Sequence, residues 1–162
     1  IIANRFSKIG SIPELQKRDV VLVTKKAFDY LQSRSSQQIY FSFSSSDTEI
    51  KTLLNEELFG WVIENLIKNA IDAMLGKGEV SLVIENSAKN IRILISDTGK
   101  GMPKKLFSQI FKPGFTTKKR GWGLGLSLSN RIVEEYHKGK IFVQKSELGK
   151  GTTFEILVPK IS

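Results

Sequence analysis

The sequence predicts an α+β fold, and three observations support this class. Two pairs of strand patterns, in residues 80–96 and 141–158, are each joined by a short turn, which is typical of antiparallel hairpins. Two amphipathic helical patterns, in residues 55–74 and 125–136, each precede one of these pairs. A chain of 162 residues with 40% hydrophobic content can bury one substantial core, so we expect a single domain with short appendages.

The N-terminal part of the chain predicts a helix end, a helix and a strand. Residues 3–9 are predicted to end a helix, because a glycine and a proline follow them. Asp19 is a suitable N-cap for a helix that runs to about Leu31. In residues 39–44 large apolar residues alternate with tyrosine and serine, which predicts a half-buried strand.

The clearest helix covers residues 55–74. Its apolar residues recur at three- and four-residue spacing, and Gly76 supplies a stop signal. Two strand patterns follow, in residues 80–85 and 91–96, with a polar turn between them. Because every second residue of the latter pattern is an isoleucine, we expect a hairpin with one buried face that ends at Asp97.

A polar, glycine-rich stretch occupies residues 98–123 and contains one short helical pattern, in residues 104–111. Loops of this length in compact domains are usually functional or disordered. A second amphipathic helix is predicted for residues 125–136, and two final strands are predicted for residues 141–145 and 152–158.

Composition limits the possible functions. The 25 Lys and Arg exceed the 16 Asp and Glu, and such a balance is compatible with nucleic-acid binding. Many of these cations fall in residues 100–120, where a loop beside a triphosphate also needs them, and no aromatic residues are interleaved for base stacking. We therefore expect no nucleic-acid partner. The chain has no cysteine and no apolar run of roughly 18 residues that could span a bilayer, so a cytoplasmic location is expected.

The first candidate functional element lies on the helix of residues 55–74. Asn65, Asn69 and Asp72 fall within a narrow arc of this helix, away from its main apolar stripe. Amide and carboxylate oxygens suit Mg²⁺, which is usually bound together with substrate phosphates. Asn65 and Asn69 are therefore candidate metal ligands, although the same asparagines could simply solvate the helix face.

The second element is the turn that begins at Asp97. A carboxylate accepts a hydrogen bond from the exocyclic amine of adenine, whereas guanine has a carbonyl there, so Asp97 would select adenine. Gly99 and Gly101 would allow a positive φ and the close approach of a ligand. An ordinary Asp-Thr-Gly turn is the alternative interpretation.

The third element is a glycine run, Gly121, Gly123 and Gly125, before the helix of residues 125–136. Unpaired backbone N–H groups at a helix N-terminus favour anions, so a phosphate is the expected ligand. The spacing matches neither the Rossmann fingerprint nor the P-loop. The glycines would also let residues 102–122 open and close as a lid.

The predicted lid carries apolar anchors and cations. Phe107, Phe111 and Phe115 are spaced by four, and we expect them to dock the lid on the core. The cations expected to contact phosphate are Lys118, Lys119 and Arg120.

Together these segments resemble the N, G1, F, G2 and G3 boxes of sensor histidine kinases. The matching segments are residues 64–70, 97–101, 111–118, 121–126 and 149–154. They occur in the family's order within residues 38–158. The resemblance implies the catalytic ATP-binding domain of that family, a two-layer α/β sandwich called the Bergerat fold, which gyrase, Hsp90 and MutL share. In this fold a mixed, mostly antiparallel sheet packs against helices, and a mobile lid covers ATP.

The resemblance also implies roles for individual residues. Asn69, with Asn65, would bind Mg²⁺, Asp97 would bind adenine, and Thr152 would lie near the base. The other residues expected to bind ATP are Gly99, Gly101, Thr116, Thr117, Lys118, Gly121, Gly123, Leu124 and Gly125. Catalysis would rest on positioning and charge neutralisation. The residues expected to serve it are Asn69, Lys118 and Arg120.

Asn65 separates two branches of this superfamily. The hydrolysing members carry a glutamate four residues before the metal-binding asparagine, where it activates water. Here that position is Asn65, whose amide cannot act as a general base, so phosphoryl transfer is favoured over hydrolysis. One alternative is an ATP-hydrolysing module of the gyrase, Hsp90 or MutL kind with Glu64 as the base. Another is a degenerate interaction domain that binds no nucleotide.

The family's phosphoacceptor is a histidine on a separate helical hairpin. His137 is an unsuitable acceptor, because it is followed by a lysine and lies near a helix end. Residues 4–9 resemble the exit of the hairpin. We therefore expect residues 1–18 to be its C-terminal end and linker, and residues 19–162 to be the catalytic domain.

The expected function is donation of the γ-phosphoryl group of Mg·ATP to a histidine on the upstream dimerisation and phosphoacceptor domain. A response-regulator receiver domain would then accept the phosphoryl group. The chain is expected to be a monomer by itself, and the longer protein a homodimer, whether anchored to the membrane or not.

Overall fold

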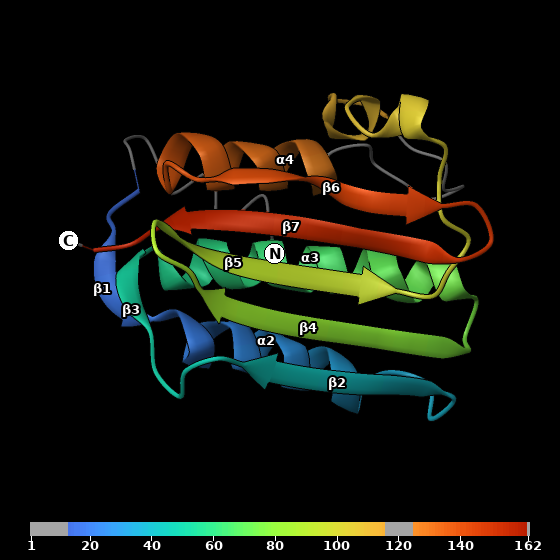
Figure 1. The fold of residues 1–162 in the computed structure, drawn as a ribbon, viewed down its shortest axis with the longest axis horizontal. Coiled ribbons are helices and arrows are strands. Elements are labelled where there is room, and N and C mark those ends of the chain that lie inside the picture. Colours follow the sequence, from blue (N-terminus) through green and yellow to red (C-terminus); the bar gives the residue numbers. More distant parts are fainter. Residues whose placement is uncertain (1–12, 116–124, 162) are drawn as a thin grey trace.

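The computed structural model describes residues 13–115 and 125–161, in which two strands follow each helix along the chain (Figure 1). The helices are α2 (Val20–Ser33), α3 (Glu56–Met74) and α4 (Gly125–Arg131). The strands are β1 (Gln16–Asp19), β2 (Ile39–Ser45), β3 (Lys51–Leu54), β4 (Gly78–Asn86), β5 (Asn90–Asp97), β6 (Lys140–Glu147) and β7 (Gly151–Pro159). Two 3₁₀ turns, Lys104–Leu106 and Gln109–Phe111, follow β5, and a π-helical turn, Ile132–Tyr136, continues α4.

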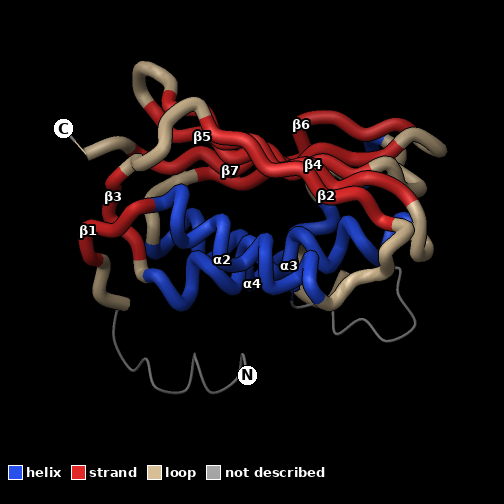
Figure 2. The backbone as a smooth tube through the Cα atoms, turned by 90° about the horizontal axis from the view of Figure 1, so that it is seen from below, coloured by secondary structure: helices blue, strands red, loops and turns tan. Residues whose placement is uncertain are grey.

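Five strands form one sheet in the order β2-β4-β5-β7-β6. Only β2 and β4 run parallel, and the other neighbours are antiparallel. All three helices lie against one face of this sheet, so the domain has two layers (Figure 2). The predicted α+β class and the two-layer sandwich with a mixed, mostly antiparallel sheet are confirmed.

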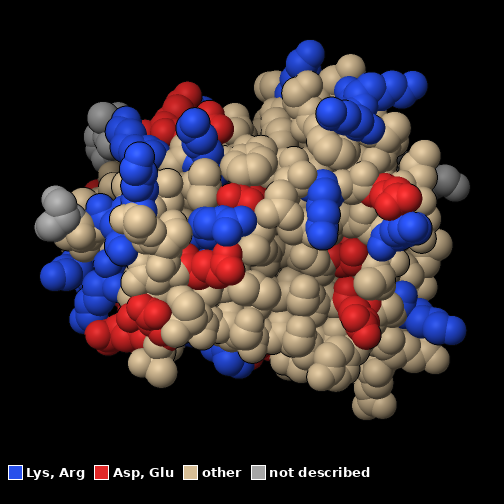
Figure 3. Space-filling model, in the orientation of Figure 1, with Lys and Arg blue, Asp and Glu red and all other residues tan. Residues whose placement is uncertain are grey.

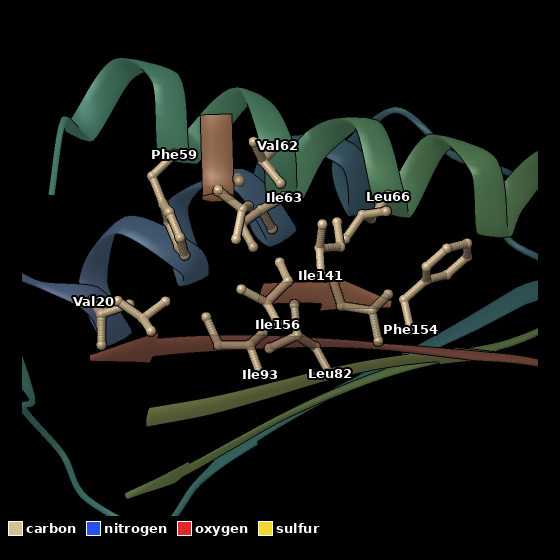
Figure 4. Close-up of a cluster of buried hydrophobic side chains, with 14 of the residues drawn as sticks. Val20, Phe59, Val62, Ile63, Leu66, Leu82, Ile93, Ile141, Phe154 and Ile156 are labelled. Atoms are coloured by element: carbon tan, nitrogen blue, oxygen red, sulfur yellow. The ribbon is translucent and has the colours of Figure 1, made fainter. Parts of the chain in front are cut away.

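The core lies between α3 and the inner face of the sheet (Figure 4). Val62, Ile63 and Leu66 of α3 are fully buried, because their spacing puts them on one side of the helix. They lie opposite fully buried residues of the strands, among them Leu82 and Ile93. This packing fixes α3, and therefore its asparagines, relative to the sheet.

The Asp19 cap of α2 and the Gly76 stop of α3 are confirmed, and Asn55 caps the start of α3. The Asp19 carboxylate accepts a hydrogen bond from the Val21 N–H at 3.0 Å and another from Ile50 N–H at 3.0 Å. The Asn55 side chain accepts one from the Leu58 N–H at 3.0 Å. At the other end of α3, Leu75 has a φ of 54° and Gly76 a φ of 89°, which terminates the helix.

The short strands and the segment after β5 differ from the prediction. The four-residue strands β1 and β3 were not predicted, and they pair with each other outside the main sheet. The boundary predicted after residue 18 stays a prediction. The helical pattern in residues 104–111 forms two 3₁₀ turns instead of one helix, because packing of Phe107, Ile110 and Phe111 on the core holds this segment.

The outer face of the sheet carries charges of both signs (Figure 3). Arg92 lies on the central strand, β5, and pairs with Glu85 at 2.8 Å and with Glu155 at 3.2 Å. Within the described part of the chain, no helix is both long and apolar enough to cross a membrane. The helix end predicted for residues 3–9 lies outside the described residues.

Candidate nucleotide-binding site

The described residues contain about half of the predicted site. The predicted site residues that the structure describes are Asn65, Asn69, Asp97, Gly99, Gly101, Gly125 and Thr152. Those outside the described residues are Thr116, Thr117, Lys118, Lys119, Arg120, Gly121, Gly123 and Leu124. The site can therefore be built from its two ends, one at the end of β5 and one where α3 meets α4.

Asp97 is the last residue of β5 and lies on the side of the sheet that faces the helices. Its Oδ1 accepts hydrogen bonds from the Gly99 N–H at 2.8 Å and from the Thr152 N–H at 3.3 Å. Burial raises the pKa of Asp97, and the two backbone hydrogen bonds oppose this shift. Because both bonds from described residues use Oδ1, the carboxylate is held in one orientation with Oδ2 as its remaining acceptor.

Thr152, whose N–H binds Asp97, also contacts Ser146 through its hydroxyl. Its hydroxyl lies 2.7 Å from the hydroxyl of Ser146, which also accepts a hydrogen bond from the Met102 N–H at 2.8 Å. Ser146 was not predicted from the sequence, because a single serine in a strand has no local signature. The contact ties the start of the predicted lid to the β6–β7 hairpin beside Asp97.

Gly99 and Gly101 are both packed against protein backbone. A Cβ on Gly99 would lie 2.5 Å from the carbonyl oxygen of Ala73, the residue whose oxygen also accepts the Lys100 N–H at 3.0 Å. Gly101 has a φ of +69°, and a Cβ there would lie 2.0 Å from the carbonyl oxygen of Glu147. The sequence predicts that a ligand lies close to these glycines, but in the structure the backbone of α3 lies against Gly99 and that of β6 against Gly101. Contact of the two glycines with ATP stays a prediction.

The second end of the site lies where α3 meets the first residue of α4. The Asn65 Nδ2 donates a hydrogen bond to the Ser129 Oγ at 3.1 Å, and the Ser129 Oγ donates to the Gly125 carbonyl at 2.8 Å. A Cβ on Gly125 would lie 2.8 Å from the Asn65 Oδ1. The fold therefore brings the predicted metal ligand Asn65 into contact with the last glycine of the predicted phosphate-binding run.

Ser129 was also missed by the sequence prediction. It lies four residues after Gly125, a spacing at which a helical serine can bond to the carbonyl of the preceding turn. That spacing is the one signal that could have indicated it. The contact with Asn65 crosses 64 positions of the chain and depends on the packing of α3 against α4.

Asn69 and Asp72 follow Asn65 along α3, and both make further interactions of their own. The described residues contain no group of three or more His, Cys, Asp or Glu that could hold a metal ion. Amide oxygens, such as those of Asn65 and Asn69, are ligands that Mg²⁺ accepts together with phosphate oxygens, and the assignment of these two residues stays a prediction.

The aromatic residues of the lid segment dock on the core as predicted. Phe107, Phe111 and Phe115 are partly buried and pack against the main hydrophobic cluster. The Phe111 ring meets the Phe154 ring edge to face, with centroids 6.2 Å apart. Phe111 therefore anchors the described part of the lid segment to β7.

Glu64, the alternative candidate for a general base, lies away from the contact between Asn65 and α4. Glu64 lines a groove between α2 and α3 together with Val23, Tyr30 and Gly60, on another side of α3 from the contact between Asn65 and α4. Glu64 therefore lies beside the groove between α2 and α3.

His137 is buried and structural. Its Nε2 accepts the Asn55 N–H at 3.0 Å, its Nδ1 lies 2.9 Å from the Ile132 carbonyl, and burial lowers its pKa. Because Ile132 offers only an acceptor, Nδ1 carries the proton. Both nitrogens are therefore engaged, which agrees with the expectation that His137 is no phosphoacceptor.

Comparison with known proteins agrees with this arrangement. Residues 55–162 match the family described as histidine kinase-, DNA gyrase B- and HSP90-like ATPase. The sensor histidine kinase ZraS of Escherichia coli K12 is 37% identical over 128 residues, which cover 79% of this chain and 27% of ZraS. Sporulation kinase C of Bacillus subtilis 168 is 41% identical over 98 residues, which cover 60% of this chain and 22% of that kinase.

A solved structure shows the same fold over nearly the whole chain. The nucleotide-free catalytic domain of the histidine kinase ThkA superposes with a TM-score of 0.82 at 28% identity, and the match covers 91% of this chain and 96% of that domain. The chain therefore belongs to the family of histidine kinase-, DNA gyrase B- and HSP90-like ATPases, as an ATP-binding domain of the histidine kinase type.

Proposed function

We propose that this domain binds Mg·ATP and, in a longer protein, donates the γ-phosphoryl group to a histidine on an upstream domain. The observation that carries the proposal is the placement of Asn65 against Gly125 and Ser129, at the position where hydrolysing relatives have a glutamate. An amide cannot take a proton from water, so this site suits transfer to another nucleophile better than hydrolysis.

Asp97 is proposed to select adenine. Its Oδ1 is held by two backbone N–H groups, and Oδ2 can accept one hydrogen bond from the exocyclic amine. Guanine would place a carbonyl oxygen against this carboxylate, which is repulsive. Thr152 donates its backbone N–H to Asp97, so its proposed place near the base follows from the same contact.

The donor set of α3 fits a magnesium ion that arrives with the nucleotide. Asn65 gives its N–H to Ser129, which leaves Oδ1 for a cation, and Asn69 is the second proposed ligand. When bound, the ion would neutralise phosphate charge during phosphoryl transfer. Lys118 and Arg120 are proposed to add positive charge from the lid, and the remaining lid and glycine residues to bind phosphates by their backbone and hydroxyl groups.

The chain spans 27% of ZraS and 22% of sporulation kinase C, so the activity of the whole protein is a proposal. We propose an upstream dimerisation and phosphoacceptor domain, connected through residues 1–18, and a response-regulator receiver domain as the final acceptor. The proposed location is the cytoplasm.

Titration calorimetry with Mg·ATP and Mg·GTP tests the nucleotide assignment. The parent chain should bind ATP at least about tenfold more tightly than GTP, and Asp97→Asn should lose most of that preference. Equal binding of the two nucleotides by the parent chain would overturn the adenine assignment. No binding of either would instead support a degenerate interaction domain.

The choice between kinase and hydrolase is tested by phosphate release. We expect the isolated chain to release little phosphate from ATP, and Glu64→Gln to leave that rate unchanged, because Glu64 lines the groove between α2 and α3. Transfer should be seen as acid-labile phosphate on the protein's own upstream domain when the two are mixed with labelled ATP. Steady phosphate release that Glu64→Gln abolishes would favour the hydrolysing module.

A further inference from the structure

Ser129 is a fully buried hydroxyl at the contact between α3 and α4. Its Oγ donates to the Gly125 carbonyl at 2.8 Å and lies 3.1 Å from the Asn65 amide. No role in nucleotide binding follows from its residue type alone. Its place between a helix carbonyl and a proposed metal ligand suggests one.

The hydrogen-bond chemistry of this contact allows a single arrangement. A serine hydroxyl has one proton, and a backbone carbonyl can only accept, so the Ser129 proton is committed to Gly125. The bond between Ser129 and Asn65 must then be donated by the Asn65 Nδ2. If the amide turned over, the Asn65 Oδ1 would face a hydroxyl oxygen that has no proton to give.

Packing at Gly125 restricts the same amide. A Cβ at Gly125 would lie 2.8 Å from the Asn65 Oδ1 and 3.1 Å from its Nδ2. The amide therefore lies directly against the backbone of α4. Ser129 decides which end of the amide is nitrogen, and Gly125 provides the space that the amide occupies.

We propose that Ser129 is a positioning residue that orients the Asn65 amide for the nucleotide-bound metal. A divalent cation binds the carbonyl oxygen of an amide, whereas the NH₂ end presents two N–H donors with no lone pair for a metal. By taking the N–H, Ser129 reserves Oδ1 for the cation. The proposal rests on the proposed function, in which Asn65 is a metal ligand.

The test compares nucleotide binding with and without metal in two variants of Ser129. A non-hydrolysable ATP analogue is titrated into the parent chain, Ser129→Ala and Ser129→Thr, once with Mg²⁺ and once with a chelator. Loss of a partner that orients a metal ligand typically costs about 10- to 100-fold in metal affinity. Ser129→Ala should therefore lower the Mg²⁺-dependent gain in affinity by about tenfold and leave binding in chelator unchanged, and Ser129→Thr, which keeps the hydroxyl, should restore the gain.

A matched control is available in Ser35. Its hydroxyl makes the same kind of bond, to the Leu31 carbonyl four residues earlier at 2.6 Å, just beyond the end of α2. Ser35→Ala should leave the Mg²⁺-dependent gain at the parent value. An equal drop in Ser35→Ala and Ser129→Ala would overturn the proposal, because it would show a general effect of losing a serine bond.

A double variant separates this proposal from the proposed function. If Ser129 acts through Asn65, Ser129→Ala should have no further effect on the Mg²⁺-dependent gain once Asn65 is alanine. A further drop in that background contradicts the positioning role. If Asn65→Ala itself leaves the gain unchanged, the metal assignment of the proposed function fails instead, and the role of Ser129 fails with it.

The orientation can also be observed without nucleotide or metal. In the nucleotide-free chain, the side-chain NH₂ of Asn65 should show one proton that exchanges slowly with water in an NMR experiment, because it is bonded to a buried hydroxyl. Ser129→Ala should abolish that protection, and Ser129→Thr should keep it. Protection that survives in Ser129→Ala would show that another group fixes the amide.

Discussion

The two ends of the candidate site are held in different ways. At the Asp97 end, the carboxylate is oriented by backbone N–H groups, and neighbouring glycines lie so close to other backbone that no side chain fits. At the Asn65 end, one side chain is oriented by another, Ser129. The proposed base-binding end is therefore held by the backbone, whereas the proposed metal-binding end depends on a contact between two side chains.

The largest effect is expected at Gly151, beside Asp97. This glycine has a φ of +121°, and a Cβ there would lie 2.0 Å from the Asp97 carbonyl oxygen. Gly151→Ala should lower the free energy of unfolding by about 3 kcal/mol or more, because it adds backbone strain to a clash that β5 and β7 must absorb. Denaturant unfolding measures the change. A loss below about 1 kcal/mol would mean that the backbone at this end adapts more easily than the comparison assumes.

A smaller loss is expected at His137, which joins the N-cap residue of α3 to the turn after α4. His137→Ala removes two hydrogen bonds and leaves a cavity, so we expect a loss of about 2–3 kcal/mol in the free energy of unfolding. Because α3 and α4 meet at Asn65, the Mg²⁺-dependent part of nucleotide binding should weaken more than the metal-free part. Equal weakening of both would show that the metal-binding end is no more dependent on side chains than the other end.

His137 also predicts a pH dependence of stability. Burial lowers its pKa below the ordinary value of about 6.5, so the unfolded chain takes up the proton first as the pH falls. Stability should be full above pH 6.5 and should decrease as the pH falls through this value toward the lowered pKa. His137→Gln should lack this decrease between pH 7 and 5. The assignment is simple to check, because the chain has one histidine.

Asp97→Asn is expected to weaken ATP binding about tenfold and to stabilise the nucleotide-free domain at pH 7. The amide oxygen can still accept the N–H groups of Gly99 and Thr152, while the cost of a buried charge disappears. Burial raises the pKa of Asp97, so the carboxylate lowers stability as the pH rises from about 3.9 through the raised pKa. The stability difference between variant and parent should therefore shrink below pH 3.9. A variant that is less stable than the parent at pH 7 would contradict this account.

The parts of the fold that were predicted from the sequence carry strong local signals. The helix of residues 55–74 has regular apolar spacing and a glycine stop signal, and β5 has an isoleucine at every second position, so the helix and the β4–β5 hairpin were found within a few residues. The strands β1 and β3 were missed because they are four residues long and β1, with the sequence QKRD, has no apolar residue. These two strands form because they pair with each other across a long stretch of sequence, and no local sequence pattern indicates such pairing.

The candidate site also contains residues that could be predicted from the sequence and residues that could not. Asn65 and Asp97 could be predicted because their types and positions are typical of a nucleotide site. The contacts of Ser129 with Asn65 and of Ser146 with Thr152 could not be predicted, because they form only in the folded chain. The glycines could be predicted in part. The sequence indicates that something lies close to Gly101, but only the fold shows that the backbone of Glu147 does so.

The smallest expected effect comes from Gly60, which tests whether the sensitivity of glycines is specific to the Asp97 end. Gly60 lies inside α3, one turn before Glu64, and a Cβ there would have nothing within 4 Å. Gly60→Ala should raise the free energy of unfolding by about 0.5–1 kcal/mol, because alanine loses less backbone freedom in a helix. Nucleotide binding should not change, since Gly60 lines the groove between α2 and α3 together with Glu64. A loss of stability here comparable to that of Gly151→Ala would show that glycine is required throughout the domain, and the contrast between the two ends would no longer explain the effect at Gly151.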